Sequence, residues 1–457
     1  MHLHILGASG TFMGGIALIA RELGHRVTGV DANTYPPMSS LLAEQNVLIA
    51  QGYSSDLPRP RPDRILIGNA LSRGNPAVET ALGSGLDYES GPQWLAEHVL
   101  RKRTVTAVAG THGKTTTSAM LAHLLETCGH APGFLIGAVP GTFSTSARCG
   151  TGKHFVVEAD EYDSAFFDKR PKFIHYHPQV AVLNNLEFDH ADIYASVEDI
   201  IIQFHYLVRT IAPEGTVIVN QADPNLGRVL AKGCWSNLQY FDSRPGARAA
   251  WTVQPLVSDC SSFVLHHHGV VAGEVRWSLF GHHNMTNALA AIAAADALGL
   301  DTDKTCAAMC TFIAPRRRLQ CLFKRDELCV YDDFAHHPSA IAVTLEALRL
   351  HHPGQPLVAI IEPRSNTMKR GDQAAQLGTS LAAADHVIIR QHPDLSWNPV
   401  DLAIPGDHTR LDVCDSIEDI LMLLDSEIFP TGSLVLMSNG SFDGLARRLV
   451  DRLNEAN

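Results

Sequence analysis

The chain has 457 residues, of which 45% are hydrophobic and 18% charged, and its formal net charge is −12. This length allows about three domains, each with its own core, and the acidic balance argues against general binding to nucleic acid or acidic membranes. No stretch approaches the run of about 18 apolar residues that a membrane span needs, and the N-terminus lacks the pattern of a cleavable signal. The nine cysteines include no C-x-x-C pair. We therefore expect a cytoplasmic globular protein with reduced thiols.

The first predicted elements form a βαβ unit. An apolar strand at residues 3–6 leads into a glycine-rich turn and a helix, and a second strand ends at Asp31. The turn contains Gly7, Gly10, Met13 and Gly14. Because its glycines do not fit G-x-G-x-x-G, the turn suits a pyrophosphate at a helix N-terminus without indicating NAD. Asp31 stands near the usual place of a ribose-binding carboxylate, and an ordinary turn with an exposed Asp31 is the alternative.

A phosphate loop follows the basic segment Arg101-Lys102-Arg103. The β-branched strand 105–109 breaks into the loop Gly110-Thr111-His112-Gly113-Lys114-Thr115-Thr116, and a helical pattern continues to Cys128. At such a junction, backbone N–H groups and the helix dipole bind an anion, Lys114 can reach the β- and γ-phosphates, and the following threonine can hold Mg²⁺. The motif is a shortened form, since Val108 occupies the position of its usual first glycine. The local chemistry predicts an ATP or GTP site.

Two further strand ends carry polar side chains. One strand runs into Glu158-Ala159-Asp160-Glu161, and a later one into Asn184-Asn185-Leu186-Glu187-Phe188-Asp189-His190-Ala191-Asp192. Since open parallel sheets bind ligands outside the carboxyl ends of their strands, we expect these residues to meet the phosphate loop at one edge. Glu158 is the expected Mg²⁺ ligand. His190 is a second metal ligand, a phosphate donor or a helix cap.

A helix start and an arginine cluster come next. His283, Asn284 and Asn287 begin an Ala-rich helix, where they would contact a purine edge or simply cap the helix. Ala314-Pro315 is the second predicted boundary and precedes Arg316-Arg317-Arg318. Consecutive arginines usually form a solvated face, but at a hinge beside a nucleotide domain one of them can supply charge to a transferring phosphoryl group.

The last segment again alternates strands and helices, and its strand ends carry Asp333, His336, His337, Arg364 and Lys369. His336 and His337 are candidate general bases, because a histidine with a pKa of about 6.5 can accept a proton at neutral pH. Arg364 and Lys369 could bind the carboxylates of a ligand, because a guanidinium forms a bidentate pair with a carboxylate and an ammonium also attracts one. The chain is thus expected to be an α/β protein with three domains, at residues 1–103, 104–314 and 315–457.

Together these motifs resemble those of the muramate ligase family, over essentially the whole chain. Gly110 to Thr116 resembles the family's phosphate loop, Asn185 to His190 its T-N-I-x-x-D-H stretch with Asn184 in place of Thr, and Arg317-Arg318 its hinge arginine pair. The resemblance implies a Rossmann-like UDP-binding domain, a central P-loop ATPase-like domain with a mainly parallel sheet, and a mobile Rossmann-like α/β domain for the incoming peptide.

The resemblance also implies a reaction. The lactyl carboxylate of UDP-N-acetylmuramate would be activated by ATP as an acyl phosphate, which an amine displaces to form an amide, with release of ADP and phosphate. ATP and Mg²⁺ are the implied cofactors, with two ions during turnover. Such a ligase works in the bacterial cytoplasm. We leave its oligomeric state open between a monomer and a weak dimer.

The implied roles fall on individual residues. ATP would be held by Gly110, Thr111, His112, Gly113, Lys114, Thr115, Thr116, His283, Asn284, Asn287, Arg317 and Asp333. Metal ions would be held by Thr115, Glu158 and His190. Substrates would contact Gly7, Gly10, Met13, Gly14, Asp31, Asn185, Arg364 and Lys369. Catalytic roles are implied for Lys114, His190, Arg317 and His337, with His336 as the alternative to His337 in amine deprotonation.

Within the family, the stretches 10–15, 31–38 and 362–369 resemble members that attach the recycled tripeptide L-alanyl-γ-D-glutamyl-meso-diaminopimelate. L-alanine-adding members, whose first turn typically reads G-x-G-x-x-G-M-G-G, are the alternative. A nicotinamide-dependent oxidoreductase is suggested only by the first βαβ unit. A kinase or nucleotide switch would share the phosphate loop but would not need the first and third domains.

Overall fold

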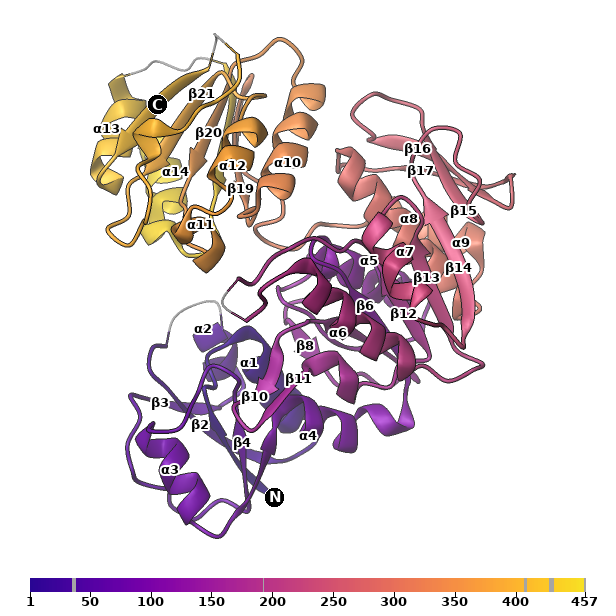
Figure 1. Ribbon diagram of the computed structural model, residues 1–457, viewed down its shortest axis with the longest axis vertical. Helices are drawn as coiled ribbons and strands as arrows, with labels where there is room; N and C mark the ends of the chain where they lie inside the picture. Colours follow the sequence, from indigo (N-terminus) through magenta and orange to yellow (C-terminus); the bar gives the residue numbers. More distant parts are fainter. Residues whose placement is uncertain (35–37, 192, 407–408, 427–430, 456–457) are drawn as a thin grey trace.

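The computed structural model of the chain describes residues 1–34, 38–191, 193–406, 409–426 and 431–455. Three main sheets succeed one another along the chain (Figure 1). The sequence predicted this α/β architecture, and the structure confirms it. In the described part of the chain, none of the helices has the length and apolar character required to cross a membrane.

The first sheet has five parallel strands in the order β3-β2-β1-β4-β5. The elements of this part are β1 (His2–Leu6), α1 (Thr11–Glu22), β2 (Arg26–Asp31), α2 (Met38–Glu44), β3 (Leu48–Gln51), β4 (Arg64–Ile67), α3 (Pro76–Gly83), β5 (Asp87–Ser90), α4 (Gly91–His98) and a 3-10 turn, η1 (Leu100–Lys102). The predicted βαβ unit at the N-terminus is therefore present. Gly7, with φ of 80°, makes the turn between β1 and α1 in a conformation that disfavours side chains.

The central sheet has ten strands in the order β17-β16-β15-β14-β13-β12-β6-β9-β7-β8. Its elements, with a separate hairpin of β10 and β11, are β6 (Thr104–Ala109), α5 (Lys114–Thr127), β7 (Gly133–Leu135), β8 (Ala147–Arg148), β9 (His154–Ala159), β10 (Asp163–Ala165), β11 (Asp168–Pro171), η2 (Lys172–His175), β12 (Val180–Leu183), α6 (Val197–Arg209), β13 (Thr216–Asn220), α7 (Pro224–Ala231), β14 (Asn237–Asp242), β15 (Trp251–Pro255), β16 (Ser262–His267), β17 (Val270–Arg276), α8 (His282–Ala297) and α9 (Thr302–Met309). Strands β12, β6 and β9 are parallel neighbours. The predicted meeting of three polar strand ends at one edge is confirmed.

The third sheet has six strands in the order β18-β19-β23-β20-β21-β22, all parallel except the edge strand β18. Its elements are β18 (Gln320–Arg325), β19 (Leu328–Asp333), α10 (Pro338–His351), β20 (Leu357–Ile361), α11 (Asn366–Arg370), α12 (Ala374–Ser380), β21 (His386–Arg390), η3 (Pro399–Asp401), β22 (Arg410–Cys414), α13 (Ile417–Ser426), β23 (Gly432–Met437), η4 (Phe442–Gly444) and α14 (Leu445–Glu455).

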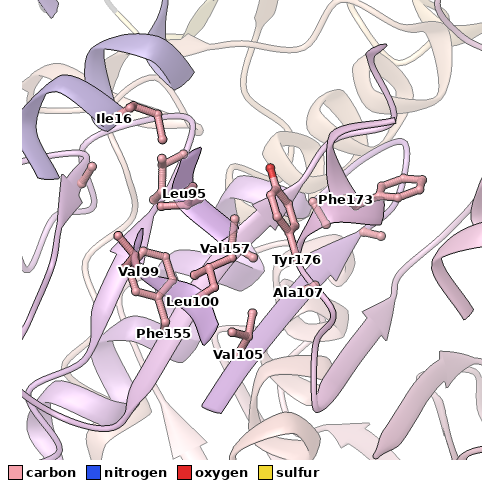
Figure 2. Close-up of a cluster of buried hydrophobic side chains, with 14 of the residues drawn as sticks. Ile16, Leu95, Val99, Leu100, Val105, Ala107, Phe155, Val157, Phe173 and Tyr176 are labelled. Carbon is pink, nitrogen blue, oxygen red and sulfur yellow. The ribbon is translucent and has the colours of Figure 1, made fainter. Parts of the chain in front are cut away.

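The first and central parts share one hydrophobic core. Figure 2 shows Ile16 of α1 and Leu95 of α4 on one side, facing Phe155 and Val157 of the central strand β9. The hairpin of β10 and β11 adds a second contact, because Phe167 packs edge-on against Tyr88 of the first sheet, with ring centroids 5.3 Å apart. These two parts are therefore joined by buried apolar surface, which is the dominant stabilising term in such contacts.

The third part has two clusters of its own on the two faces of its sheet. Its contacts with the central part are mainly polar and lie around the phosphate loop, as described below. One apolar exception is Phe280, whose ring stacks on His351 of α10 at a centroid distance of 4.0 Å. The first part is thus joined to the central part by a shared core and the third part mainly by polar contacts, and the mobility of the third part stays a prediction.

Candidate active site

The phosphate loop lies between β6 and α5, as predicted. Gly110 has φ of 153° and Gly113 has φ of 77°, and a side chain at either position would strike Asn184 or Asn287. The loop backbone is fixed by Asn185, whose Oδ1 accepts the His112 N–H at 2.7 Å. Tight glycine turns of this kind leave backbone N–H groups free to surround an anion at the N-terminus of a helix.

Lys114 is held by a buried acidic partner. Its Nζ donates to Gly110 O at 2.6 Å and to Glu161 Oε2 at 3.0 Å. The other Glu161 oxygen lies 2.9 Å from Nε2 of His190. Although burial opposes both shifts, the Glu161 carboxylate raises the pKa of Lys114 and the pKa of His190. The sequence pattern places Glu161 in an acidic strand end but predicts no role for it.

Thr115 and Glu158 form the second polar group at this edge. Thr115 Oγ1 donates to Glu158 Oε1 at 3.0 Å, and the other carboxylate oxygen accepts the Gly137 N–H at 2.7 Å. Both residues were predicted metal ligands, and the structure places them in contact. Their hydroxyl and carboxylate oxygens are ligands that Mg²⁺ prefers. His190, the third predicted ligand, belongs instead to the group formed by Asp160, Glu161 and His190.

The hinge arginines point in different directions. Arg318 Nη2 donates to Thr115 Oγ1 at 3.0 Å, and its guanidinium lies 4.8 Å from the centroid of the Phe334 ring. Arg317 turns toward the third part, where its Nη2 donates to Ser438 O at 2.6 Å and its Nε lies 3.3 Å from Asp332. The contact between Arg317 and phosphates stays a prediction, and in this arrangement it is Arg318 that reaches the phosphate loop.

The start of α8 packs against the phosphate loop. Asn287 Oδ1 accepts from Thr117 Oγ1 at 3.2 Å, and Asn284 donates to Phe280 O at 2.9 Å. Burial lowers the pKa of His283 to about 4. Asp333 accepts two backbone N–H groups of the hinge, from Leu319 and Ala335, and burial raises its pKa to about 6. The predicted roles of these residues toward adenine and ribose stay predictions.

The loop after β12 contacts the third part directly. Glu187 Oε2 accepts Ser339 Oγ at 2.7 Å and lies 3.5 Å from His337 Nδ1. Asp189 accepts Thr367 Oγ1 at 3.2 Å. The sequence motif contains Glu187 and Asp189 but predicts no contact for them, because their partners lie about 150 or more positions away in the chain.

The predicted substrate residues occupy two separate places. Asp31 accepts the Ser9 N–H at 2.8 Å, so it closes the turn that carries Gly7 and Gly10. Met13 is buried, and Gly14 lies against Met38, so a Cβ would not fit there. Residues 35–37, within the stretch 31–38, and Asp192, within the strand end after residue 183, lie outside the described residues.

In the third part, Arg364 is exposed and lies against Gly440. Lys369 donates to Asp394 at 3.2 Å. Of the two candidate bases, His336 Nδ1 lies 2.9 Å from Phe334 O, and His337 caps α10 by accepting the Ser339 N–H at 3.3 Å. Burial lowers the pKa of both histidines, that of His336 to about 4. Both are therefore neutral near pH 7 and able to accept a proton.

Comparison with known proteins agrees with this geometry. Three family models match the chain: "Mur ligase family, catalytic domain" over residues 2–103, "Mur ligase middle domain" over 108–295 and "Mur ligase, glutamate ligase domain" over 317–440. A murein peptide ligase from Psychrobacter arcticus has a similar structure, with a TM-score of 0.76, 42% identity, and coverage of 99% of this chain and 98% of that one.

Two curated sequences are also similar. The UDP-N-acetylmuramate–L-alanyl-γ-D-glutamyl-meso-2,6-diaminoheptandioate ligase of Escherichia coli K12 is 48% identical, covering 99% of this chain and 98% of its own length. A UDP-N-acetylmuramate–L-alanine ligase of Syntrophomonas wolfei is 33% identical, covering 92% and 87% respectively. The family resemblance predicted from the motifs is therefore confirmed. The chain belongs to the Mur ligase family of ATP-dependent, amide-forming ligases.

Proposed function

We propose that this ligase joins the tripeptide L-alanyl-γ-D-glutamyl-meso-diaminopimelate to the lactyl carboxylate of UDP-N-acetylmuramate, with ATP as the energy source. The observation that carries the proposal is the 48% identity, over nearly both full lengths, to a relative named for this tripeptide, against 33% to a relative named for L-alanine. The reaction activates the carboxylate as an acyl phosphate, which the tripeptide amine displaces. This reaction belongs to the recycling of bacterial cell-wall peptides in the cytoplasm.

The phosphate loop fits ATP. Gly110 and Gly113 hold the loop in conformations with positive φ and leave no room for a Cβ beside Asn184 and Asn287, and Lys114 stands at the first position of the helix. We propose that Lys114 exchanges its contact with Glu161 for the β- and γ-phosphates, since phosphate oxygens are stronger charge partners for an ammonium than a single carboxylate. Asn284 and Asn287 at the start of α8, with His283, hold adenine, and Asp333 holds the ribose.

The donor set fits Mg²⁺. Thr115 and Glu158 supply a hydroxyl and a carboxylate already in contact, and His190 with Glu161 supplies a second group of donors close by. These residues would hold Mg²⁺, which when bound would supply positive charge to offset the charge on phosphoryl oxygens. We propose one ion on Thr115 and Glu158 and a second on His190, whose second nitrogen is oriented by Glu161 as ligating histidines are by carboxylates.

Side chains of the protein stabilise the charge on the phosphoryl group and accept the proton of the attacking amine. Arg318, which donates a hydrogen bond to Thr115, stabilises negative charge at the transferring phosphoryl group. The sequence motif assigns this role to Arg317, which is the alternative. A neutral His337 or His336 accepts the proton that the attacking amine must lose. The third part contacts the phosphate loop through Arg318 and His337, and its closure over the loop would keep water from the acyl phosphate.

Substrate recognition is divided between the outer parts. We propose that the turn with Gly7, Gly10, Met13 and Gly14 holds the UDP pyrophosphate at the N-terminus of α1, and that Asp31 and Asn185 contact the sugar nucleotide. Arg364 is exposed, and Lys369 has one acidic partner, so both are proposed to bind the carboxylates of the peptide.

The test is phosphate release from ATP and Mg²⁺ with UDP-N-acetylmuramate, comparing L-alanine with the tripeptide as acceptor. A far higher kcat/KM for the tripeptide supports the proposal. If L-alanine is the better acceptor, the chain acts in precursor synthesis and the roles of Arg364 and Lys369 are wrong. Nucleotide hydrolysis that ignores both acceptors would argue against ligation altogether.

A further inference from the structure

A cluster of two histidines and one carboxylate lies where the third part meets the phosphate loop. His112 comes from the loop itself, Glu187 from the segment after β12, and His337 from the N-terminus of α10. Their ligand atoms, one from each residue, all lie within 4.8 Å of one another. The rings of the two histidines are tilted by 47°, with centroids 4.8 Å apart. The cluster includes none of the residues proposed above to hold Mg²⁺.

The distances match a tetrahedral metal site. A Zn²⁺ ion with ligand bonds of about 2.0–2.2 Å sets its ligand atoms about 3.4 Å apart. Glu187 Oε2 lies 3.3 Å from His112 Nε2 and 3.5 Å from His337 Nδ1. Two edges of such a tetrahedron are therefore already formed. Two imidazoles and one carboxylate form a donor set that suits Zn²⁺ better than Mg²⁺, because Mg²⁺ takes mostly oxygen ligands and this cluster offers two nitrogens for one carboxylate.

The Glu187 and His337 side chains are in the forms that bind metals. Burial alone would raise the pKa of Glu187. Hydrogen bonds from His112 and Ser339 outweigh this effect and lower the pKa to about 2, so the carboxylate is ionised. Burial lowers the pKa of His337, so its ring is neutral near pH 7. His337 Nε2 lies 3.3 Å from Phe188 O, the type of backbone contact that orients ligating histidines.

Ser339 now occupies part of this donor set. Its N–H donates to His337 Nδ1 at 3.3 Å and its Oγ donates to Glu187 Oε2 at 2.7 Å. A cation would replace these two hydrogen bonds with stronger bonds to the same lone pairs. Ser339 is partly exposed, so its hydroxyl can turn to water when the cation binds.

We propose that His112, Glu187 and His337 bind one Zn²⁺ ion, with water as the fourth ligand. Two of the ligands belong to the central part and one to the third part, so the ion ties the third part to the phosphate loop. This proposal does not depend on the identity of the amine acceptor, and with Nδ1 of His337 on the ion and its Nε2 on Phe188 O, it leaves His336 as the candidate that accepts the amine proton. It concerns a different cluster from that of Asp160, Glu161 and His190, which has one histidine and two carboxylates.

The test is a titration of the metal-free, full-length chain with Zn²⁺ in competition with a chromogenic chelator. We expect one tight ion per chain, bound at least about tenfold more weakly after His112→Asn, Glu187→Gln or His337→Asn, because each change removes one direct ligand. His336→Asn is the matched control, since this neighbouring histidine faces Phe334 O instead. Glu161→Gln is the control for the other cluster.

A second measurement needs no substitution and so does not depend on how the variants fold. X-ray absorption at the zinc edge of the unmodified chain should show two imidazoles among the atoms bound to the ion. One imidazole, or weaker binding in Glu161→Gln but not in Glu187→Gln, would assign the ion to the other cluster and overturn the proposal. Unchanged binding in folded His337→Asn, or no tight ion at all, would overturn it as well.

Discussion

The two hinge arginines give a sharp prediction, because both lie over the Phe334 ring but form their hydrogen bonds with different parts of the molecule. Arg318 contacts Thr115 of the phosphate loop, whereas Arg317 contacts Ser438 and Asp332 of the third part. Removing one preorganised donor from a site of developing charge costs about 3–4 kcal/mol in the activation free energy. We therefore expect Arg318→Ala to lower kcat by about 10²–10³-fold.

Arg317→Ala should act on stability instead. It removes a hydrogen bond to a backbone carbonyl and an ion pair whose arginine side chain is 32% exposed, which together contribute about 1–2 kcal/mol to the free energy of unfolding. Arg316, an exposed member of the same triplet, is the matched control, and Arg316→Ala should change neither quantity.

The assay measures kcat for phosphate release at saturating ATP and acceptors, and the free energy of unfolding in urea, for all three variants. Arg318→Lys adds a test of geometry, since an ammonium keeps the charge but loses the planar fork and the contact with Phe334. Loss of turnover at unchanged stability in Arg317→Ala, together with a kcat near its original value in Arg318→Ala, would show that Arg317 and not Arg318 acts on the phosphoryl group.

Three further predictions concern single sites. Lys114→Met should lower kcat by about 10²–10³-fold in the same assay, because it removes the charge that binds the phosphates. The circular dichroism spectrum should be unchanged, and normal turnover would contradict the ATP site. Phe155→Ala, at a side chain with no exposed surface, should lower the free energy of unfolding in urea by about 3–5 kcal/mol, whereas Phe167→Ala, at 39% exposure, should cost far less. Burial raises the pKa of Asp333 from 3.8 to about 6, so the folded chain binds this proton more tightly than the unfolded chain. The associated stability is present below about pH 4 and lost as the pH rises through about 6, on the order of 3 kcal/mol, and Asp333→Asn should flatten that part of the urea-denaturation profile.

Much of the fold follows from local pattern. The apolar strands that end at Ala109, Leu183 and Ile361 are buried on both faces, as strands of a parallel sheet between helices are, and such runs are visible in the sequence. The glycines that permit the phosphate loop are equally local. The position of the carboxyl ends at one edge then follows from parallel pairing alone, because it does not require the strand order to be known.

Other features depend on pairing between distant segments. The hairpin of β10 and β11 packs Phe167 on Tyr88, and the core of Figure 2 joins α1 and α4 to β9. Neither contact has a periodic signal, because each half is an ordinary apolar side chain in its own element. The sequence therefore predicts where each part begins and ends but does not predict the buried contact that joins the first part to the central one.

The choice between Arg317 and Arg318 shows the same limit within a single turn. The motif predicts that an arginine at the hinge reaches the nucleotide, but it does not predict which one. Arg317 has φ of 61° and Leu319 has φ of 51°, so two left-handed residues flank Arg318. Such conformations are disfavoured in isolation and exist here because Asp333 accepts the Leu319 N–H and Gln320 accepts the Arg317 N–H. Both guanidinium groups lie over the Phe334 ring, but their hydrogen bonds go to Ser438 for Arg317 and to Thr115 for Arg318. The direction of each arginine is therefore set by hydrogen bonds that form only once the third part has folded against the hinge.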